Sequence, residues 1–139
     1  MVRRGTLRPV SGVNVQVFGT PDSSATRAAQ RFFKERRIEI HFVDVRRKPL
    51  APAELRRFVD RLGARAVADE DSRAWRDAGL THLRMDDAEL AERLLGDQRL
   101  LKLPLVRVGN GVAAGKDEPA WKSLLTAVTD RHDPRREAS

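Results

Sequence analysis

The amino-acid sequence predicts an α/β fold, a four-stranded mixed sheet with flanking helices and a helical insertion. Apolar residues alternate with a period of two over four short stretches, and they recur at helical spacing between those stretches. The resulting order is strand, helix, strand, helix, a group of short helices, two strands and a helix. A strand–helix–strand start with a closing hairpin and helix indicates a mixed sheet that carries helices on its faces.

The first two elements are a strand and a helix. Residues 13–18, VNVQVF, place Val13, Val15 and Val17 on one face of a strand. A helix is expected over about 24–36, after a turn that contains Gly19 and Pro21. Its narrow apolar stripe consists of Ala28, Ala29, Phe32 and Phe33.

The next two elements are again a strand and a helix. Residues 38–45, IEIHFVDV, are partly apolar on both faces, which predicts a strand inside a sheet that is covered on two sides. Lys48 and Pro49 end this pattern. A helix then spans about 53–62, and Gly63 ends it.

A helical insertion is expected over about 69–98, with Asp86 and Asp87 as helix start signals. Trp75 and Leu80 are its apolar anchors, and they are followed by Leu83, Leu90, Leu94 and Leu95. The stretch LVRVGNGVAA after Pro104 predicts a hairpin with its turn at Gly109-Asn110-Gly111. A last helix over about 118–129 carries Trp121, Leu124, Leu125 and Val128.

The elements make one domain over residues 13–129. Residues 1–12 are expected to form a flexible arm and 130–139 a polar tail, because neither carries an apolar period. No apolar run reaches the roughly 18–20 residues that cross a bilayer, and the N-terminus has no signal-peptide core, so a cytoplasmic protein without membrane attachment is expected.

The chain contains no cysteine, which excludes disulfides, thiolate metal sites and a thiol redox cycle carried by this chain alone. The net charge of +7 is spread over helix faces where arginines alternate with acids. With no tyrosine and no strand of paired aromatic and basic residues, specific nucleic-acid binding is disfavoured. Helix starts explain the paired acids, so no metal site or nucleotide motif is predicted.

The stretch VFGTPDSSATRAAQRFF, residues 17–33, turns from a strand into a helix, where a reactive group would meet the helix N-terminus. Three interpretations are open: a redox site without its sulfur, a hydroxyl-based site, or a capped helix. A serine nucleophile needs an adjacent base, and none of His41, His82 and His132 is near in sequence. An N-cap role for Ser23 or Ser24 is favoured.

These motifs resemble the arsenate reductase-like family, ArsC and Spx-type proteins with a glutaredoxin/thioredoxin fold. The resemblance covers about residues 13–127. It is carried by Phe18-Gly19-Thr20 before the turn, Arg27 behind it, FFKERRI leading into the second strand, and LPLVR followed by a glycine near the end. It implies a thioredoxin-like sheet.

The resemblance also implies functional positions at the first turn. The family's reactive cysteine or selenocysteine falls on Ser23, or on Ser24 if the loop slips by one residue. The second cysteine of some Spx-type members falls on Thr26, and the family arginine is kept as Arg27. A helix N-terminus with a guanidinium can form an anion site; the alternative is an exposed Arg27 that pairs with Asp22 or with solvent.

A third set of implied positions lies before the hairpin. Pro104 matches the family's late proline, expected to be cis and to face the helix N-terminus, where a groove could hold an extended peptide. The oxyanion-holding arginine of arsenate reductases is replaced by Leu103, with Lys102 one step earlier as a possible substitute.

The resemblance thus implies a thiol oxidoreductase scaffold whose reactive position is a serine, inactive or altered in this chain, and it leaves open whether the chain is an enzyme. The alternatives are a non-catalytic, Spx-like regulator that binds the RNA polymerase α subunit, or a pseudo-enzyme that binds a small anion or peptide. No resident cofactor is expected; glutathione or another thiol donor is implied by the resemblance only.

Overall fold

The computed structural model describes residues 14–131, with the side chains of residues 14–128. Its strands are β2 (Val15–Gly19), β3 (His41–Asp44), β4 (Leu105–Val108) and β5 (Gly111–Ala114). Its helices are α1 (Ser24–Glu35), α2 (Pro52–Leu62), α3 (Ala64–Val67), α4 (Arg73–Asp77), α5 (Asp87–Gly96), the 3-10 helix η1 (Gln98–Leu100) and α6 (Glu118–Arg131). The expected arm over 1–12 lies outside the described residues, and α6 continues to residue 131, two residues past its expected end.

The four strands form one mixed sheet in the order β3-β2-β4-β5, which confirms the predicted α/β class. β2 runs parallel to β3 and antiparallel to β4, and β4 pairs antiparallel with β5. Gly109 and Asn110 make the hairpin turn, and Gly111 already belongs to β5. β2 is central, so its residues are buried toward both faces.

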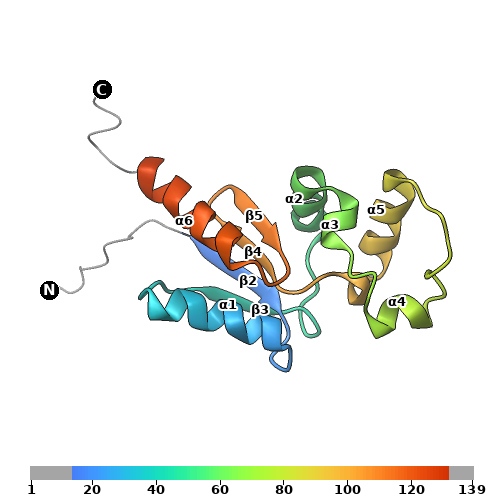
Figure 1. Ribbon diagram of the computed structural model, residues 1–139, viewed down its shortest axis with the longest axis horizontal. Helices are drawn as coiled ribbons and strands as arrows, with labels where there is room; N and C mark the ends of the chain where they lie inside the picture. Colours follow the sequence, from blue (N-terminus) through green and yellow to red (C-terminus); the bar gives the residue numbers. More distant parts are fainter. Residues whose placement is uncertain (1–13, 132–139) are drawn as a thin grey trace, which may run out of the picture.

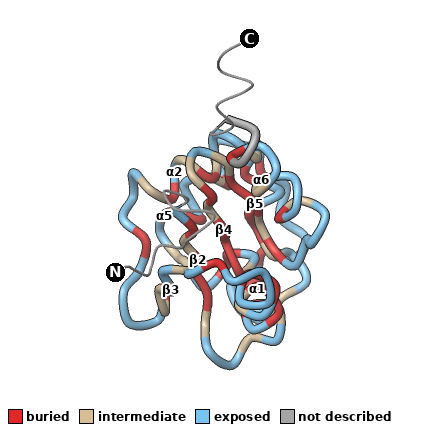
Figure 2. The backbone as a smooth tube through the Cα atoms, turned by 90° about the vertical axis from the view of Figure 1, so that its left-hand side faces the viewer, coloured by how far each residue is buried: buried red, intermediate tan, exposed pale blue. Residues whose placement is uncertain are grey.

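Each face of the sheet has its own core (Figures 1 and 2). On one face α1 and α6 pack on the valines of β2 and β4, and Phe32 lies 5.3 Å from Trp121 between ring centroids. On the other face α2 and the insertion helices pack around Phe18 and Phe58, whose rings meet edge-on at 5.9 Å. Burying one such side chain stabilises the fold by about 1.5–3 kcal/mol.

The insertion is a closed unit of α3, α4, α5 and η1, and it begins at Ala64, five residues earlier than expected. Its two ends meet in an antiparallel bridge between Ala68 and Leu101. Trp75 and Leu80 are buried anchors as predicted, whereas Leu83, which follows them in the chain, is 49% exposed. Leu83 lies in the loop between α4 and α5, where no helix directs it inward.

The expected interior position of the second strand is also wrong, because β3 is an edge strand that pairs only with β2 in the described part of the chain. Its two apolar faces have another cause. Phe42 packs toward the α1 side and Val43 toward the α2 side, so both cores reach the edge of the sheet. The strand is also shorter than expected, since regular pairing starts at His41.

The parallel pair brings the carboxyl ends of β2 and β3 together at one edge. The Val45 amide donates to the Gly19 carbonyl at 3.0 Å, which joins the two loops that follow these strands. The connection from η1 to β4 approaches the same region and contains a cis peptide bond between Leu103 and Pro104, as predicted. None of the helices within residues 14–131 combines the length and apolar character needed to cross a bilayer.

Candidate functional site

The first turn of α1 is organised by Ser23, which is the N-cap residue. Its backbone is extended, and its hydroxyl oxygen accepts a hydrogen bond from the Thr26 amide at 3.1 Å. The Ser23 amide in turn donates to the Thr20 carbonyl at 3.1 Å. Ser24 is the first helical residue and is exposed. The structure therefore confirms the capped-helix interpretation for Ser23 and not for Ser24.

Thr26 is fully buried and faces away from solvent. Its hydroxyl oxygen accepts from the Thr20 amide at 3.4 Å. The same side chain fills the space beside Gly19, where an added Cβ would clash with Thr26 Oγ1. Thr26 thus packs the helix start against the end of β2, and this contact requires glycine at position 19.

Arg27 is exposed and holds the turn that precedes its helix. One guanidinium nitrogen donates to the Pro21 carbonyl at 3.0 Å. The alternative pairing of Arg27 with Asp22 does not form, because Asp22 pairs with Arg46 instead, at 3.3 Å. Arg27 therefore positions the loop of residues 20–22 and offers the rest of its guanidinium to solvent.

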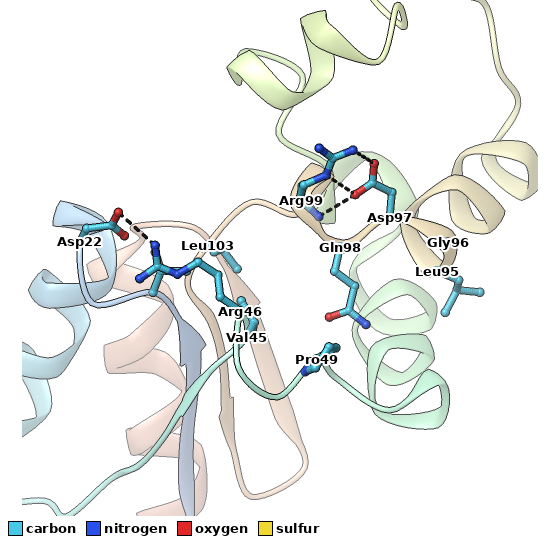
Figure 3. Close-up of a pocket in the computed structure, with 11 residues that line it drawn as sticks. Asp22, Val45, Arg46, Pro49, Leu95, Gly96, Asp97, Gln98, Arg99 and Leu103 are labelled. Carbon is cyan, nitrogen blue, oxygen red and sulfur yellow. Dashed lines mark hydrogen bonds and ion pairs between the residues drawn. The ribbon is translucent and has the colours of Figure 1, made fainter.

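A cleft of about 780 Å³ lies beside this loop (Figure 3). Its walls come from the loops after β2 and β3, residues 20–22 and 45–49, and from residues 95–99 at the junction of α5 and η1. Leu103, which precedes the cis proline, completes it. The cleft thus lies between the sheet and the insertion, at the carboxyl ends of the parallel strands, where α/β sheets commonly bind ligands.

Four charged side chains line the cleft, and they form two ion pairs on opposite walls (Figure 3). Arg46 pairs with Asp22 on the sheet side. On the insertion side Arg99 donates two hydrogen bonds to Asp97, at 2.8 and 2.9 Å. The cleft therefore presents charges of both signs and no net charge from these four groups.

Both carboxyl groups titrate below their ordinary range. A hydrogen bond from the Thr20 side chain, followed by the charge of Arg46, lowers the pKa of Asp22. The hydrogen bonds and charge of Arg99 lower the pKa of Asp97. Both carboxylates are consequently ionised at neutral pH, and each arginine has an anionic partner before any ligand arrives.

Gln98 fixes the width of the cleft. Its side-chain oxygen accepts from the Leu50 amide at 2.9 Å, and its side-chain nitrogen donates to the Leu50 carbonyl at 2.8 Å. These two bonds join the start of η1 to the loop between β3 and α2. The insertion wall is thereby fastened to the sheet side across the floor of the cleft.

Of the three candidate residues before the hairpin, only Leu103 lines the cleft, and Lys102 and Pro104 do not. Lys102 is exposed, its amide donates to the Val67 carbonyl, and its aliphatic stem lies over Gly115. Pro104 is buried directly before β4. Neither lines the cleft, whereas Leu103 does. Leu103, which the resemblance placed at the family's arginine position, therefore faces the cleft.

Sequence reasoning missed Arg46, Asp97, Gln98 and Arg99. The place of Arg46 could have been predicted from the sequence. It closely follows a strand that runs parallel to β2, and the carboxyl ends of parallel strands lie together. No sequence pattern predicts the position of the Asp97–Arg99 pair, because its place beside residues 20–22 depends on how the insertion packs. The predicted Ser23, Thr26 and Arg27 do come together at the start of α1, but none of them lines the cleft.

The structure also shows whether a histidine lies close enough to act as a base for Ser23, and whether possible metal ligands cluster. Both His41, on the edge strand, and His82, in the insertion, are exposed, and neither lines the cleft beside Ser23. His132 lies outside the described residues. Among residues 14–131, no three histidine or acidic side chains are placed to hold a metal ion together.

Comparisons with known proteins agree on the fold. Solved structures that match the chain include the YFFB (PA3664) protein (TM-score 0.70, 19% identity, covering 81% of this chain and 99% of that one) and the arsenate reductase from Vibrio cholerae (0.66, 18%, 81% and 97%). An arsenate reductase (ArsC) related protein from Brucella melitensis also matches (0.60, 16%, 79% and 92%). These similarities confirm the thioredoxin-like fold.

At the sequence level, proteins with curated descriptions give no match. A family model described as ArsC family matches residues 18–124, which include the α1 turn, the cleft and the hairpin. The chain therefore belongs to the ArsC family.

Proposed function

We propose that this chain is a ligand-binding member of the ArsC family that has no thiol cycle of its own, and that its cleft binds a small peptide with charges of both signs. Glutathione is the model ligand of this class. The family is one of arsenate reductase-like thiol oxidoreductases, so the proposal keeps the scaffold and the cleft but removes the redox step.

The first support is the chemistry at the start of α1. A thiol cycle needs a thiolate, and the chain has no cysteine. The Ser23 hydroxyl already accepts the Thr26 amide, and the described histidines are exposed elsewhere. Without a base to activate it, a serine hydroxyl is not a useful nucleophile.

The main support for the proposal is that two ion pairs, Asp22–Arg46 and Asp97–Arg99, lie on opposite walls of the cleft. A simple oxyanion such as arsenate would meet two arginines that are already neutralised by Asp22 and Asp97. A peptide can offer a carboxylate to an arginine and an ammonium to an aspartate at the same time. Exposed ion pairs contribute only about 0–1 kcal/mol each, so a ligand can exchange partners with them at low cost.

The remaining lining suits the uncharged part of such a ligand. Val45, Leu95 and Leu103 supply apolar surface between the two charged walls. A few charged groups placed around an apolar wall are typical of sites that orient a small molecule. The lining therefore favours an extended molecule with polar ends over a compact anion.

Isothermal titration of the full chain tests this proposal. S-methylglutathione, which has no free thiol, is expected to bind as tightly as glutathione, and arsenate or phosphate at least about tenfold more weakly. Arg46→Ala is expected to weaken S-methylglutathione binding by about fivefold or more, whereas Arg56→Ala on exposed α2 changes it little. Tighter binding of arsenate than of S-methylglutathione, or an equal effect of the two alanine variants, would overturn the proposal.

A further inference from the structure

The outer edge of β3 is a second surface with features of a binding site, and none of the residues of β3 lines the cleft. In the described residues β3 pairs only with β2, so its other side has no strand beside it (Figure 1). The Val45 amide points toward β2, where it donates to Gly19. In a parallel pair the direction of the backbone groups alternates along the strand. His41 and Val43 therefore share the direction of Val45, and Phe42 and Asp44 point outward.

The outward groups are available for a further strand. The Asp44 carbonyl is used, because it accepts the Arg47 and Lys48 amides in the following turn. No backbone partner from outside the strand is found for the Phe42 amide, the Phe42 carbonyl or the Asp44 amide within residues 14–131. These three groups are the donors and acceptor that an added strand would bond.

A groove on the α1 side lies next to the start of this edge, and its lining contains no residue of β3 itself. It has a volume of about 420 Å³, and it lies between the end of α1 and the approach to β3. Its lining includes Lys34 near the end of α1, Arg37 and the acidic Glu39 in the connection that follows, and the half-buried Ile40. The half-buried Phe42 follows on the same face of the strand. An added strand would cover this apolar surface with alternate side chains.

The charge around this edge is strongly positive. Residues 34–48 contain six basic and three acidic side chains, a net charge of +3. Lys34 and Arg37 lie at one end of the strand, and Arg47 and Lys48 at the other, all exposed. Within the described residues none of these four makes an ion pair.

We propose that the β3 edge binds an extended acidic peptide segment of a partner protein by strand addition. Strand addition takes its affinity from main-chain hydrogen bonds and its specificity from side chains on either side. The positive ends disfavour a second copy of the chain, because antiparallel pairing of two β3 edges would place Arg37 against Arg47 and Lys48. The chain's own residues 1–13 carry three arginines and no acid, and are disfavoured for the same reason.

The probe is a synthetic peptide, Glu-Asp-Val-Thr-Val-Thr-Val-Asp-Glu with blocked ends, added to the isotope-labelled full chain. Amide hydrogen exchange measured by NMR is the decisive readout. We expect the Phe42 and Asp44 amides to exchange at least about fivefold more slowly with peptide, while the already bonded His41 and Val43 amides change little. A merely electrostatic association would shift resonances without this alternation.

Charge variants give the matched control. Arg47→Glu combined with Lys48→Glu is expected to weaken peptide binding about tenfold at low salt. Arg56→Glu combined with Arg84→Glu changes the net charge equally on exposed sites of α2 and the insertion, and leaves binding nearly unchanged. Equal losses in the two double variants would contradict the proposal.

Three other results would overturn it. The first is that a peptide with lysine in place of its acidic residues binds as tightly as the acidic peptide. The second is that the His41 and Val43 amides, and not those of Phe42 and Asp44, exchange more slowly with peptide. The third is that a thymidine oligonucleotide binds this edge more tightly than the acidic peptide does. Arg47 and Lys48 lie in the loop whose residues Val45, Arg46 and Pro49 line the cleft, so the charge variants alone do not separate the two sites. The amide exchange at Phe42 does, because Phe42 does not line the cleft.

Discussion

Replacing Ser23 with cysteine places a thiol at the capped start of α1, and the structure predicts the acidity of that thiol. In the serine form the Thr26 amide donates to this side chain at 3.1 Å, and the first turn contains no acid. A helix N-terminus stabilises an adjacent anion by about 0.3–1 kcal/mol when exposed and by up to about 2 kcal/mol when partly buried. Ser23 is half-buried.

The expected shift follows from these values. A stabilisation of about 1.4 kcal/mol corresponds to one pKa unit, so the pKa of the Ser23→Cys thiol should fall from about 8.5 to about 7.5. Asp22 is the nearest opposing charge, but its pairing with Arg46 weakens that opposition. Thiolate absorbance followed against pH measures the pKa without background, because the parent chain has no cysteine.

Ser72 offers a matched control. It caps α4 with the same geometry, since its hydroxyl accepts from the Trp75 amide at 3.1 Å. However, α4 has only five residues, and the Ser72 hydroxyl also contacts the Asp69 carbonyl at 2.8 Å. The pKa of the Ser72→Cys thiol should therefore stay near or above about 8.5. A Ser23→Cys value no lower than that of Ser72→Cys would refute the reasoning about α1.

Three further predictions concern the cleft and its supports. The Asp22–Arg46 pair should persist to acid pH: the folded pKa of Asp22 is lowered, so its stabilising contribution is complete above the ordinary value of 3.8 and is lost below it. NMR titration of the Asp22 carboxyl carbon checks this, and a midpoint above 3.8 contradicts it. Gly19→Ala should destabilise the fold by about 1–3 kcal/mol, because the new methyl group meets Thr26 Oγ1. Adding Thr26→Ala should recover part of that loss in denaturant unfolding, and strictly additive losses would be the contrary result. Asp86→Ala removes the capping box of α5 and should cost about 1 kcal/mol in the same assay, where no loss would count against the cap.

Local patterns predicted most of the fold because local physics determines those parts. The apolar stripe of α1 is buried as its spacing required. Gly63 ends α2 with a positive φ of 88°, which glycine adopts without steric cost. The hairpin of β4 and β5 follows from its Gly-Asn turn. In each case the deciding residues are neighbours in the chain.

The predictions failed where contacts between residues far apart in the sequence determine the structure. Two apolar faces on residues 38–45 fit an interior strand, yet β3 is at the edge of the described sheet. Both of its faces are apolar because both cores extend to that edge. The Asp22–Arg46 pair joins loops 24 residues apart, and the Leu50–Gln98 bonds span 48 residues. No periodicity in the sequence encodes these contacts, so the cleft could be located only from the structure.

The central claim is that the cleft binds a charged peptide without thiol chemistry, and calorimetric titration with S-methylglutathione tests it most directly. We expect S-methylglutathione to bind saturably, as tightly as glutathione and at least about tenfold more tightly than arsenate, and Arg46→Ala to weaken its binding. Arsenate binding tighter than S-methylglutathione, or no dependence on Arg46, would contradict it.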